Sequence, residues 1–234
     1  MVDNEIVKIK VTGDYACFTR PDLKVERMTY PCMTPSAARG ILESILWKPE
    51  FQWFIRRVIV LNPIKFASVK RNEIRTKQGR NPIIIEDARV QRNSIILKNV
   101  AYIIEASICL PQYDPHNNVK KYTEIFRRRV EKGQCWHRPY LGTREFAAEF
   151  STPSSDDRPF QMTYPIGNML FDVFYEATGK VIPLFFYDAA IVDGVLTYPE
   201  ELNIKMSKSS HLRPKSTNEL NRVLYEFNQS EERL

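Results

Sequence analysis

The stretch KKYTEIFRRRVEKGQCWHRPYLGTREF, residues 120–146, predicts a helix followed by a turn and a strand. Four apolar residues recur at helical spacing and form one stripe along the helix: Tyr122, Ile125, Phe126 and Val130. Asn117 or Asn118 can cap the start of this helix, and Gly133 can end it in the left-handed conformation. Because the charged residues fall beside the stripe, we expect the helix to pack on a core and to turn its cations toward solvent.

The same stretch holds most of the net charge of the chain. It contains eight Lys or Arg and three Glu, a net charge of +5 out of +6 for all 234 residues. Cations concentrated in this way, with Trp136, His137 and Tyr140 among them, are typical of a surface that binds nucleic acid. A solvated basic helix face is the alternative, and the helix dipole by itself favours cations near Gly133.

Strands and another helix precede this stretch. Residues 5–11 alternate between apolar and polar side chains and predict a half-buried strand. Thr34 and Pro35 predict the start of a helix, and Pro49 predicts its end. The other expected segments are strands at 54–61, 100–110 and 144–151, an extended basic arm at 63–75 and a loop at 76–93.

This order of elements predicts an α+β protein with a split βαβ, or ferredoxin-like (βαββαβ), arrangement, in which both helices cover one face of a sheet. A polar break at 151–159 marks the expected domain boundary. Asp193-Gly194 predicts a hairpin turn, and Ser216 to Glu219 forms a capping box before an amphipathic helix. The chain is thus expected to have three parts: a ferredoxin-like domain (1–151), a small antiparallel β-sheet domain (160–204) and a tail with an amphipathic helix (205–234).

Composition limits the chemistry. Apolar residues make up 43% of the chain, which is ample for a buried core. The four cysteines are far apart without a CxxC pair, and no secretory signal sequence is recognisable, so we expect free thiols in the cytoplasm. Cys135 and His137 are too few ligands for a zinc site, and we expect no metal and no other cofactor. No apolar run approaches the roughly 20 residues of a membrane span.

Five runs of the sequence follow one another in a characteristic order. They are GDYACFTRPDLKVERMTY (13–30), TPSAARGILESILWKP (34–49), VLNPIKFASVKRNE (60–73), VAYIIEA (100–106) and RRRVEKGQCWHRPYLGTREF (127–146). Together they resemble the Cas-five family of CRISPR-associated proteins, in its subtype I-C branch, also called the Dvulg or d/c type. The resemblance implies an RRM-like ferredoxin fold with a basic hairpin arm, followed by a small β domain, although the aromatic signature of the RRM is absent.

The resemblance also implies a function. Proteins of this type cut the repeat of precursor CRISPR RNA without a metal and then hold the 5′ handle inside the Cascade surveillance complex, beside its backbone and large subunits. The implied reaction is attack of a ribose 2′-OH on the neighbouring phosphate, which leaves a 2′,3′-cyclic phosphate and a free 5′-OH. It needs a base for the 2′-OH, cations for the phosphorane and a proton donor for the leaving oxygen.

Family members that cleave RNA commonly place a Tyr near the end of the first helix and a Lys-His pair at the start of the second. In this chain the first position is Leu46, and the pair is Lys120 and Lys121. The resemblance therefore implies Lys120 as electrostatic stabiliser and Lys121 as an altered acid-base group. Leu46 cannot transfer a proton, and an ammonium group is a poor base at neutral pH. A structural subunit that binds the 5′ handle without cutting it is the alternative.

Further cations are expected to contact RNA phosphates: Arg20, Lys24, Arg27, Lys70, Arg71, Arg128, Arg138 and Arg144. For each of them, simple solvation is the alternative. Tyr122 lies on the apolar stripe and is expected in the core, and His137 is expected to be a hydrogen-bonded loop residue; help in catalysis is the alternative for both. Gly142-Thr143-Arg144 leaves two interpretations open, a phosphate-binding nest and a plain turn before a strand.

Overall fold

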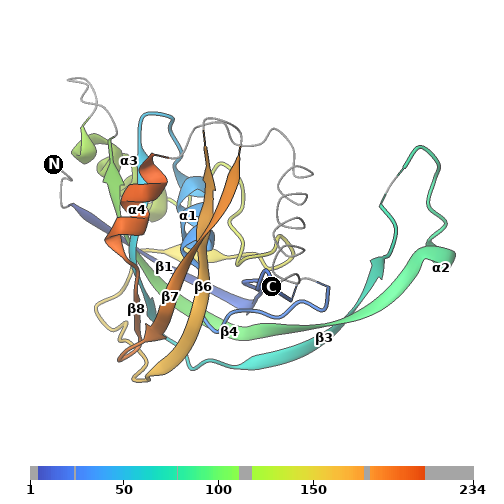
Figure 1. The fold of residues 1–234 in the computed structure, drawn as a ribbon. Coiled ribbons are helices and arrows are strands. Elements are labelled where there is room, and N and C mark those ends of the chain that lie inside the picture. Colours follow the sequence, from blue (N-terminus) through green and yellow to red (C-terminus); the bar gives the residue numbers. More distant parts are fainter. Residues whose placement is uncertain (1–4, 24, 78, 111–117, 177–179, 209–234) are drawn as a thin grey trace.

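The computed structural model describes residues 5–23, 25–77, 79–110, 118–176 and 180–208. They form a mixed α+β fold built on one large and one small antiparallel sheet (Figure 1). In the large sheet the strands run in the order β5-β1-β4-β2-β8, and β3 pairs with β4 beside this path. The bounds are β1 (Ile6–Ala16), β2 (Gln52–Val60), β3 (Phe66–Ile74), β4 (Arg89–Cys109), β5 (Glu149–Ser151) and β8 (Val195–Thr197).

The core lies on one face of the large sheet. On β1, Val7, Ile9 and Val11 are at most 2% exposed, while Lys8 between them faces solvent. This alternation is the period of two that a strand imposes on its side chains. Two helices, α1 (Pro35–Ile45) and α3 (Val119–Glu131), contribute their apolar stripes to the same buried cluster.

Both helices begin where the local sequence predicts. The Thr34 side chain accepts a hydrogen bond from the backbone N–H of Ala37 at 3.3 Å and caps α1. Asn118 caps α3 in the same way, because its side chain accepts from the N–H of Lys121 at 2.7 Å. Gly133 follows α3 with φ at +62°, the left-handed conformation that ends many helices. The helix predicted at the start of residues 120–146 is confirmed.

A two-stranded arm extends away from the body of the molecule (Figure 1). β4 is 21 residues long. Its second half pairs with β1 and β2 in the sheet, and its first half pairs with β3 from Phe66 opposite Leu97 to Ile74 opposite Arg89. A single helical turn, α2 (Ile85–Ala88), lies directly before β4. The arm is an extension of the central strand of the sheet, so its base is anchored in the core.

Some predicted boundaries differ from the structure. The loop predicted at 76–93 is wrong at its end, because β4 begins at Arg89 and pairs with β3. The strand predicted at 144–151 is shorter, since only 149–151 pair with β1. The amphipathic helix predicted from Ser216 lies outside the described residues.

The small sheet consists of β6 (Tyr164–Tyr175) and β7 (Val181–Ile191), and α4 (Glu200–Ser207) follows β8. Asp193 and Gly194 have φ of 50° and 79° and turn the chain from β7 to β8, as predicted. Unlike the expected small sheet, however, β8 pairs with β2 at the edge of the large sheet. Met169 of β6 also belongs to the same buried cluster as Ile9 of β1. The division of the chain between 151 and 160 stays a prediction.

One buried carboxylate ties three strands together. Glu105 of β4 has a side chain only 1% exposed and binds Lys8 of β1 at 2.8 Å and Arg57 of β2 at 2.5 Å. Burial by itself would raise the pKa of Glu105, but the hydrogen bonds and charges of Arg57 and Lys8 outweigh it and hold the pKa below its ordinary value. The ionised form is therefore the one that stabilises the sheet.

Replacing Glu105 with Gln is expected to lower the free energy of unfolding by about 1–2 kcal/mol at pH 7, because both cations are half-exposed and stay hydrated. Since the folded pKa is lowered, this stabilisation is present above the unfolded pKa, about 4.3, and disappears as the pH falls through the folded value. Urea denaturation at pH 7 and pH 3 measures it. A stability difference between wild type and variant that is as large at pH 3 as at pH 7 would contradict the assignment.

Candidate nucleic-acid interface

The two lysines at the start of α3 project away from the core. Lys120 and Lys121 are exposed, whereas Tyr122 beside them is 3% exposed and packs against the ring of Phe51 at 4.9 Å between centroids. The Lys121 Nζ lies 5.4 Å from the centroid of the Tyr122 ring. Asn118 caps this turn, so the backbone that carries both lysines is held by a hydrogen bond. In the described part of the chain Lys120 makes no ion pair, and its charge is available to an anion.

Leu46 lies inside the molecule. It is 1% exposed and caps the end of α1, where its carbonyl accepts a hydrogen bond from the Trp53 indole at 3.0 Å. The Trp53 ring in turn packs on Phe126 of α3, with 4.9 Å between ring centroids. Leu46, the position for which the resemblance implies a Tyr in family members that cleave, is therefore part of the packing between the two helices. It offers no group for proton transfer.

The three consecutive arginines of α3 have three different surroundings. Arg127 forms an ion pair with Glu5 at 2.9 Å. Arg129 reaches across to α1, where its guanidinium donates to the carbonyl of Ile45 at 2.5 Å and satisfies a helix end. Arg128 is exposed and makes no ion pair with any described residue. Of the three, only Arg128 was predicted to contact RNA, and only Arg128 is left for a ligand.

Four of the predicted RNA-binding residues are already paired with carboxylates. Arg20 binds Asp22 at 2.9 Å, and Arg138 binds Glu149. Two others, Arg27 and Arg71, share the carboxylates of Glu73 and Glu145, and Arg92 joins Glu73 at 3.1 Å. This cluster of three arginines and two glutamates keeps one surplus positive charge. Its arginines are held in fixed positions, which favours a preformed surface over flexible side chains.

Three other residues that were predicted to contact RNA make no ion pair with a described carboxylate. Lys70 on β3 and Arg144 are exposed and, like Arg128, make no ion pair with a described residue. Lys24 lies outside the described residues. His137 is exposed with its Nδ1 3.4 Å from the Arg138 carbonyl, in keeping with a loop residue, and Tyr122 lies in the core as predicted.

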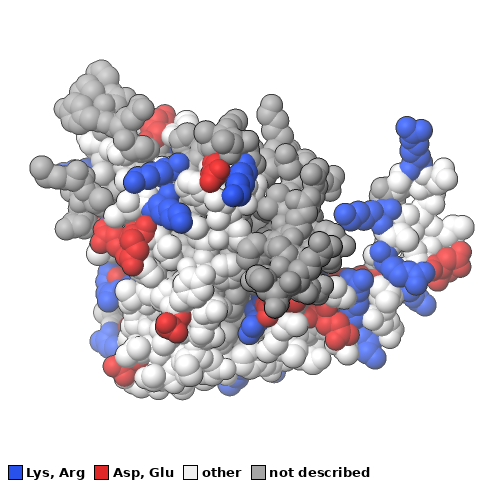
Figure 2. Space-filling model, viewed as in Figure 1, with Lys and Arg blue, Asp and Glu red and all other residues white. Residues whose placement is uncertain are grey.

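Cations of the arm were partly missed from the sequence. Between Phe66 and Leu97 there are seven Lys or Arg against three acidic residues. Figure 2 shows Lys and Arg side chains along the arm, beyond the body of the molecule. Arg80 and Arg89 belong to this set, but the interpretation of 76–93 as a loop left them aside. The net charge of the whole hairpin is the signal that would have found them.

The described residues contain neither a cluster of metal ligands nor a membrane-spanning helix. No three His, Cys, Asp or Glu side chains among them come together as ligands for a metal ion. Every helix in the same residues is too short or too polar to span a bilayer.

The sequence and the fold of this chain are similar to those of CRISPR-associated proteins. The Cas5d family model, described as CRISPR-associated protein (Cas_Cas5), matches residues 6–160. A solved structure titled "Crystal Structure of CRISPR-associated Protein" has a TM-score of 0.64 at 20% identity and covers 90% of this chain and 97% of that one. The chain belongs to the Cas5 family, in its Cas5d (subtype I-C) branch.

Two relatives carry the name CRISPR pre-crRNA endoribonuclease Cas5d. The one from Thermus thermophilus is 45% identical over 214 residues, which cover 83% of this chain and 92% of the relative. The one from Mannheimia succiniciproducens is 39% identical over 215 residues, which cover 82% of this chain and 94% of the relative. Both similarities run over nearly the whole length of the relatives.

Proposed function

We propose that this protein is an endoribonuclease that cuts CRISPR repeat RNA without a metal cofactor. The observation that carries the proposal is the similarity, at 45% and 39% identity over most of the chain, to two relatives named pre-crRNA endoribonuclease. The exposed lysines at the capped start of α3 support it, because a phosphorane needs cations held in a defined place.

In the proposed reaction the ribose 2′-oxygen attacks the adjacent phosphorus while the bond to the 5′-oxygen breaks. The 2′-OH loses its proton to water, and Lys121 donates a proton to the leaving 5′-oxygen. Lys120 stays charged and stabilises the negative phosphorane. The products are a 2′,3′-cyclic phosphate and a 5′-OH. Neither Leu46 nor Tyr122 has a role, since both are buried.

We further propose that residues 1–151 are an RRM-like ferredoxin domain and that residues 160–204 are a small β domain. The order β5-β1-β4-β2, with α1 and α3 contributing to one core, supports the first assignment. The antiparallel pairing of β6 with β7 supports the second.

After cleavage the protein is proposed to keep the 5′ handle of the product and to carry it within a Cascade complex, in contact with backbone and large subunits. The exposed cations Lys70, Arg128 and Arg144 support retention of an RNA strand. The free thiols of all four cysteines agree with the cytoplasm as the place of action. A non-catalytic subunit that only binds the handle is the second candidate, and the burial of Leu46 favours it.

Incubation of the purified protein with its own repeat RNA in EDTA separates the two candidates. A nuclease of the proposed kind produces one cut. The upstream product resists 3′-end labelling by ligation until acid opens its 2′,3′-cyclic phosphate and a phosphatase removes the resulting monophosphate. Tight binding of RNA that stays intact would support the non-catalytic subunit. Cleavage that occurs only with added Mg²⁺ would contradict the proposed chemistry.

A further inference from the structure

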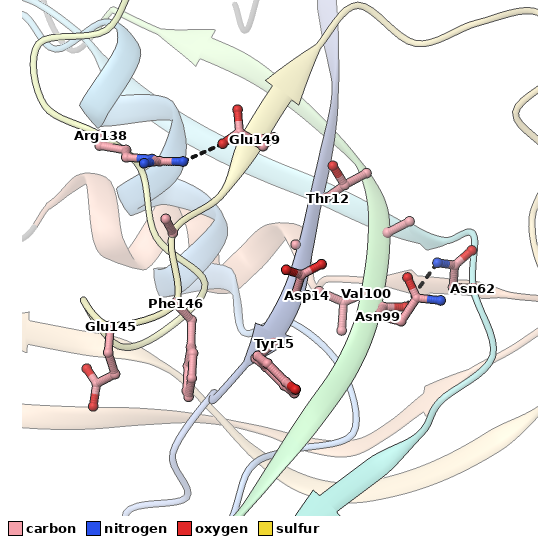
Figure 3. A pocket seen from close by; sticks show the side chains of 13 residues that line it. Thr12, Asp14, Tyr15, Asn62, Asn99, Val100, Arg138, Glu145, Phe146 and Glu149 are labelled. Carbon is pink, nitrogen blue, oxygen red and sulfur yellow. Dashed lines mark hydrogen bonds and ion pairs between the residues drawn. The ribbon is translucent and has the colours of Figure 1, made fainter.

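A cavity of about 500 Å³ opens where the arm leaves the body of the protein (Figure 3). Its walls come from the end of β1, from β4 around Asn99, from Asn62 and from the loop that leads into β5. A volume of this size accommodates a nucleotide, and small-ligand sites are typically about 300–1,000 Å³. None of the residues predicted from sequence to be catalytic lines it.

Two aromatic rings lie side by side in this cavity. Tyr15, at the end of β1, is 43% exposed, and its ring centroid lies 6.0 Å from that of Phe146 at an angle of 49°. Figure 3 shows the two side chains next to each other, Phe146 on the loop before β5 and Tyr15 at the end of β1. The rings contact each other, so a flat ligand stacks on the exposed face of Tyr15 and does not insert between them. Stacking of a base on an aromatic side chain is worth about 1–3 kcal/mol.

Acidic side chains on the walls differ in what they already bind. Glu145 is paired with Arg71 and Arg27, and Glu149 with Arg138. Asp14, directly before Tyr15, is exposed and makes no hydrogen bond or ion pair with a described residue. Of the three carboxylates on the walls, Asp14 is therefore the one that is left to accept hydrogen bonds from a ligand.

The backbone beside Asp14 is held in an unusual conformation. Asn99 on β4 has φ at +53°, which a residue other than glycine seldom adopts. Its carbonyl accepts a hydrogen bond from the Asn62 amide at 3.0 Å, which fixes both residues in the wall (Figure 3). Backbone strain of this kind is retained where the surrounding structure holds a site in place.

We propose that this cavity binds one unpaired guanine base of the RNA. The Asp14 carboxylate accepts hydrogen bonds from the adjacent N1–H and N2–H groups of guanine, while the base stacks on Tyr15. Phosphates stay outside, because the walls carry three carboxylates and one arginine. They meet two exposed cations next to lining residues: Lys98, which is opposite Tyr15 in the register of β1 and β4, and Arg144, which precedes Glu145. The inference rests on the proposed function, in that it names which feature of the RNA this protein reads.

The test uses fluorescein-labelled heptaribonucleotides, UUUGUUU and the same strand with inosine, which lacks the 2-amino group. Wild type is expected to bind the guanosine strand at least fivefold more tightly by fluorescence anisotropy, since a bidentate contact discriminates between bases by about 1–3 kcal/mol. In Asp14→Asn the preference disappears, and in Tyr15→Leu both strands bind more weakly. Asp156→Asn, an exposed carboxylate in the 151–159 segment, is the matched control and keeps the preference.

Equal binding of the two strands by wild type, or an unchanged preference in Asp14→Asn, would overturn the proposal. Cleavage of repeat RNA by the same preparation separates this outcome from failure of the proposed function. If the protein cuts the repeat but does not distinguish guanosine from inosine, the proposed guanine binding is wrong and the proposed nuclease function stands. If the protein distinguishes the two strands but does not cut the repeat, the guanine binding stands and the proposed nuclease function is wrong.

Discussion

Replacing Lys120 and Lys121 together with alanine is expected to slow cleavage of repeat RNA by about 100-fold or more. Loss of one preorganised group that stabilises transition-state charge costs about 10²–10³ in rate, and loss of a proton donor costs a similar factor. Both side chains are exposed on a turn that is capped through the backbone by Asn118, so their removal leaves the helix intact. Single-turnover cleavage in EDTA measures the effect, with circular dichroism as the test of folding.

The matched control is Lys132→Ala, which removes an exposed lysine from the other end of α3. It is expected to weaken RNA binding slightly and to leave the single-turnover rate within a factor of about three, because a distant surface charge is screened by salt. Full-rate cleavage by the Lys120→Ala single variant would remove Lys120 from the mechanism, even if the protein is a nuclease. If Lys132→Ala lowered the single-turnover rate as much as the double variant does, the effect would come from the overall positive charge of α3 and not from a catalytic site at Lys120 and Lys121.

Replacing Gly142 with alanine is expected to destabilise the fold by about 3 kcal/mol or more. Gly142 has φ at +86°, and an added Cβ would lie 2.0 Å from the carbonyl oxygen of Cys17. The loop cannot move aside easily, because Leu141 accepts a hydrogen bond from the Cys17 N–H at 3.0 Å and donates to Phe146 at 2.7 Å. Strain and overlap therefore add together. A loss of about 6–12 °C in the melting temperature corresponds to this energy for a protein of this size.

Gly133→Ala provides the comparison. Gly133 also has a left-handed φ, +62°, but an added Cβ there meets nothing within 4 Å. Gly133→Ala is therefore expected to destabilise the fold by only about 1 kcal/mol, which is the cost of holding alanine in the left-handed conformation. The prediction for Gly142 would be wrong if both variants lost the same amount of stability in parallel thermal melts.

The position of Gly142 also bears on the two interpretations that the sequence left open for residues 142–144. The hydrogen bonds of Leu141 and Phe146 close a turn, and the close approach to Cys17 anchors that turn on the chain that follows β1. A tight turn is thus sufficient to explain the glycine. Both interpretations look alike in sequence, because each requires the same left-handed residue.

Local signals predicted the helices well and the arm incompletely. Caps and apolar stripes act within four residues, so Thr34, Asn118 and Gly133 mark helix ends that the structure confirms. The first residues of β4 carried no comparable signal, because strand pairing depends on a partner elsewhere in the chain. The placement of β8 beside β2 was missed for the same reason.

The sequence by itself determined where the cations are concentrated, which helices carry them and which family the chain resembles. Only the tertiary structure decided which of these cations are free, because some of the carboxylates that neutralise them, such as Glu145 and Glu5, come from distant positions. Glu145 lies 74 residues from Arg71, and Tyr15 meets Phe146 only when β1 and the loop before β5 come together. Electrostatic neutralisation and cavity formation depend on distance in space, which a linear sequence does not contain.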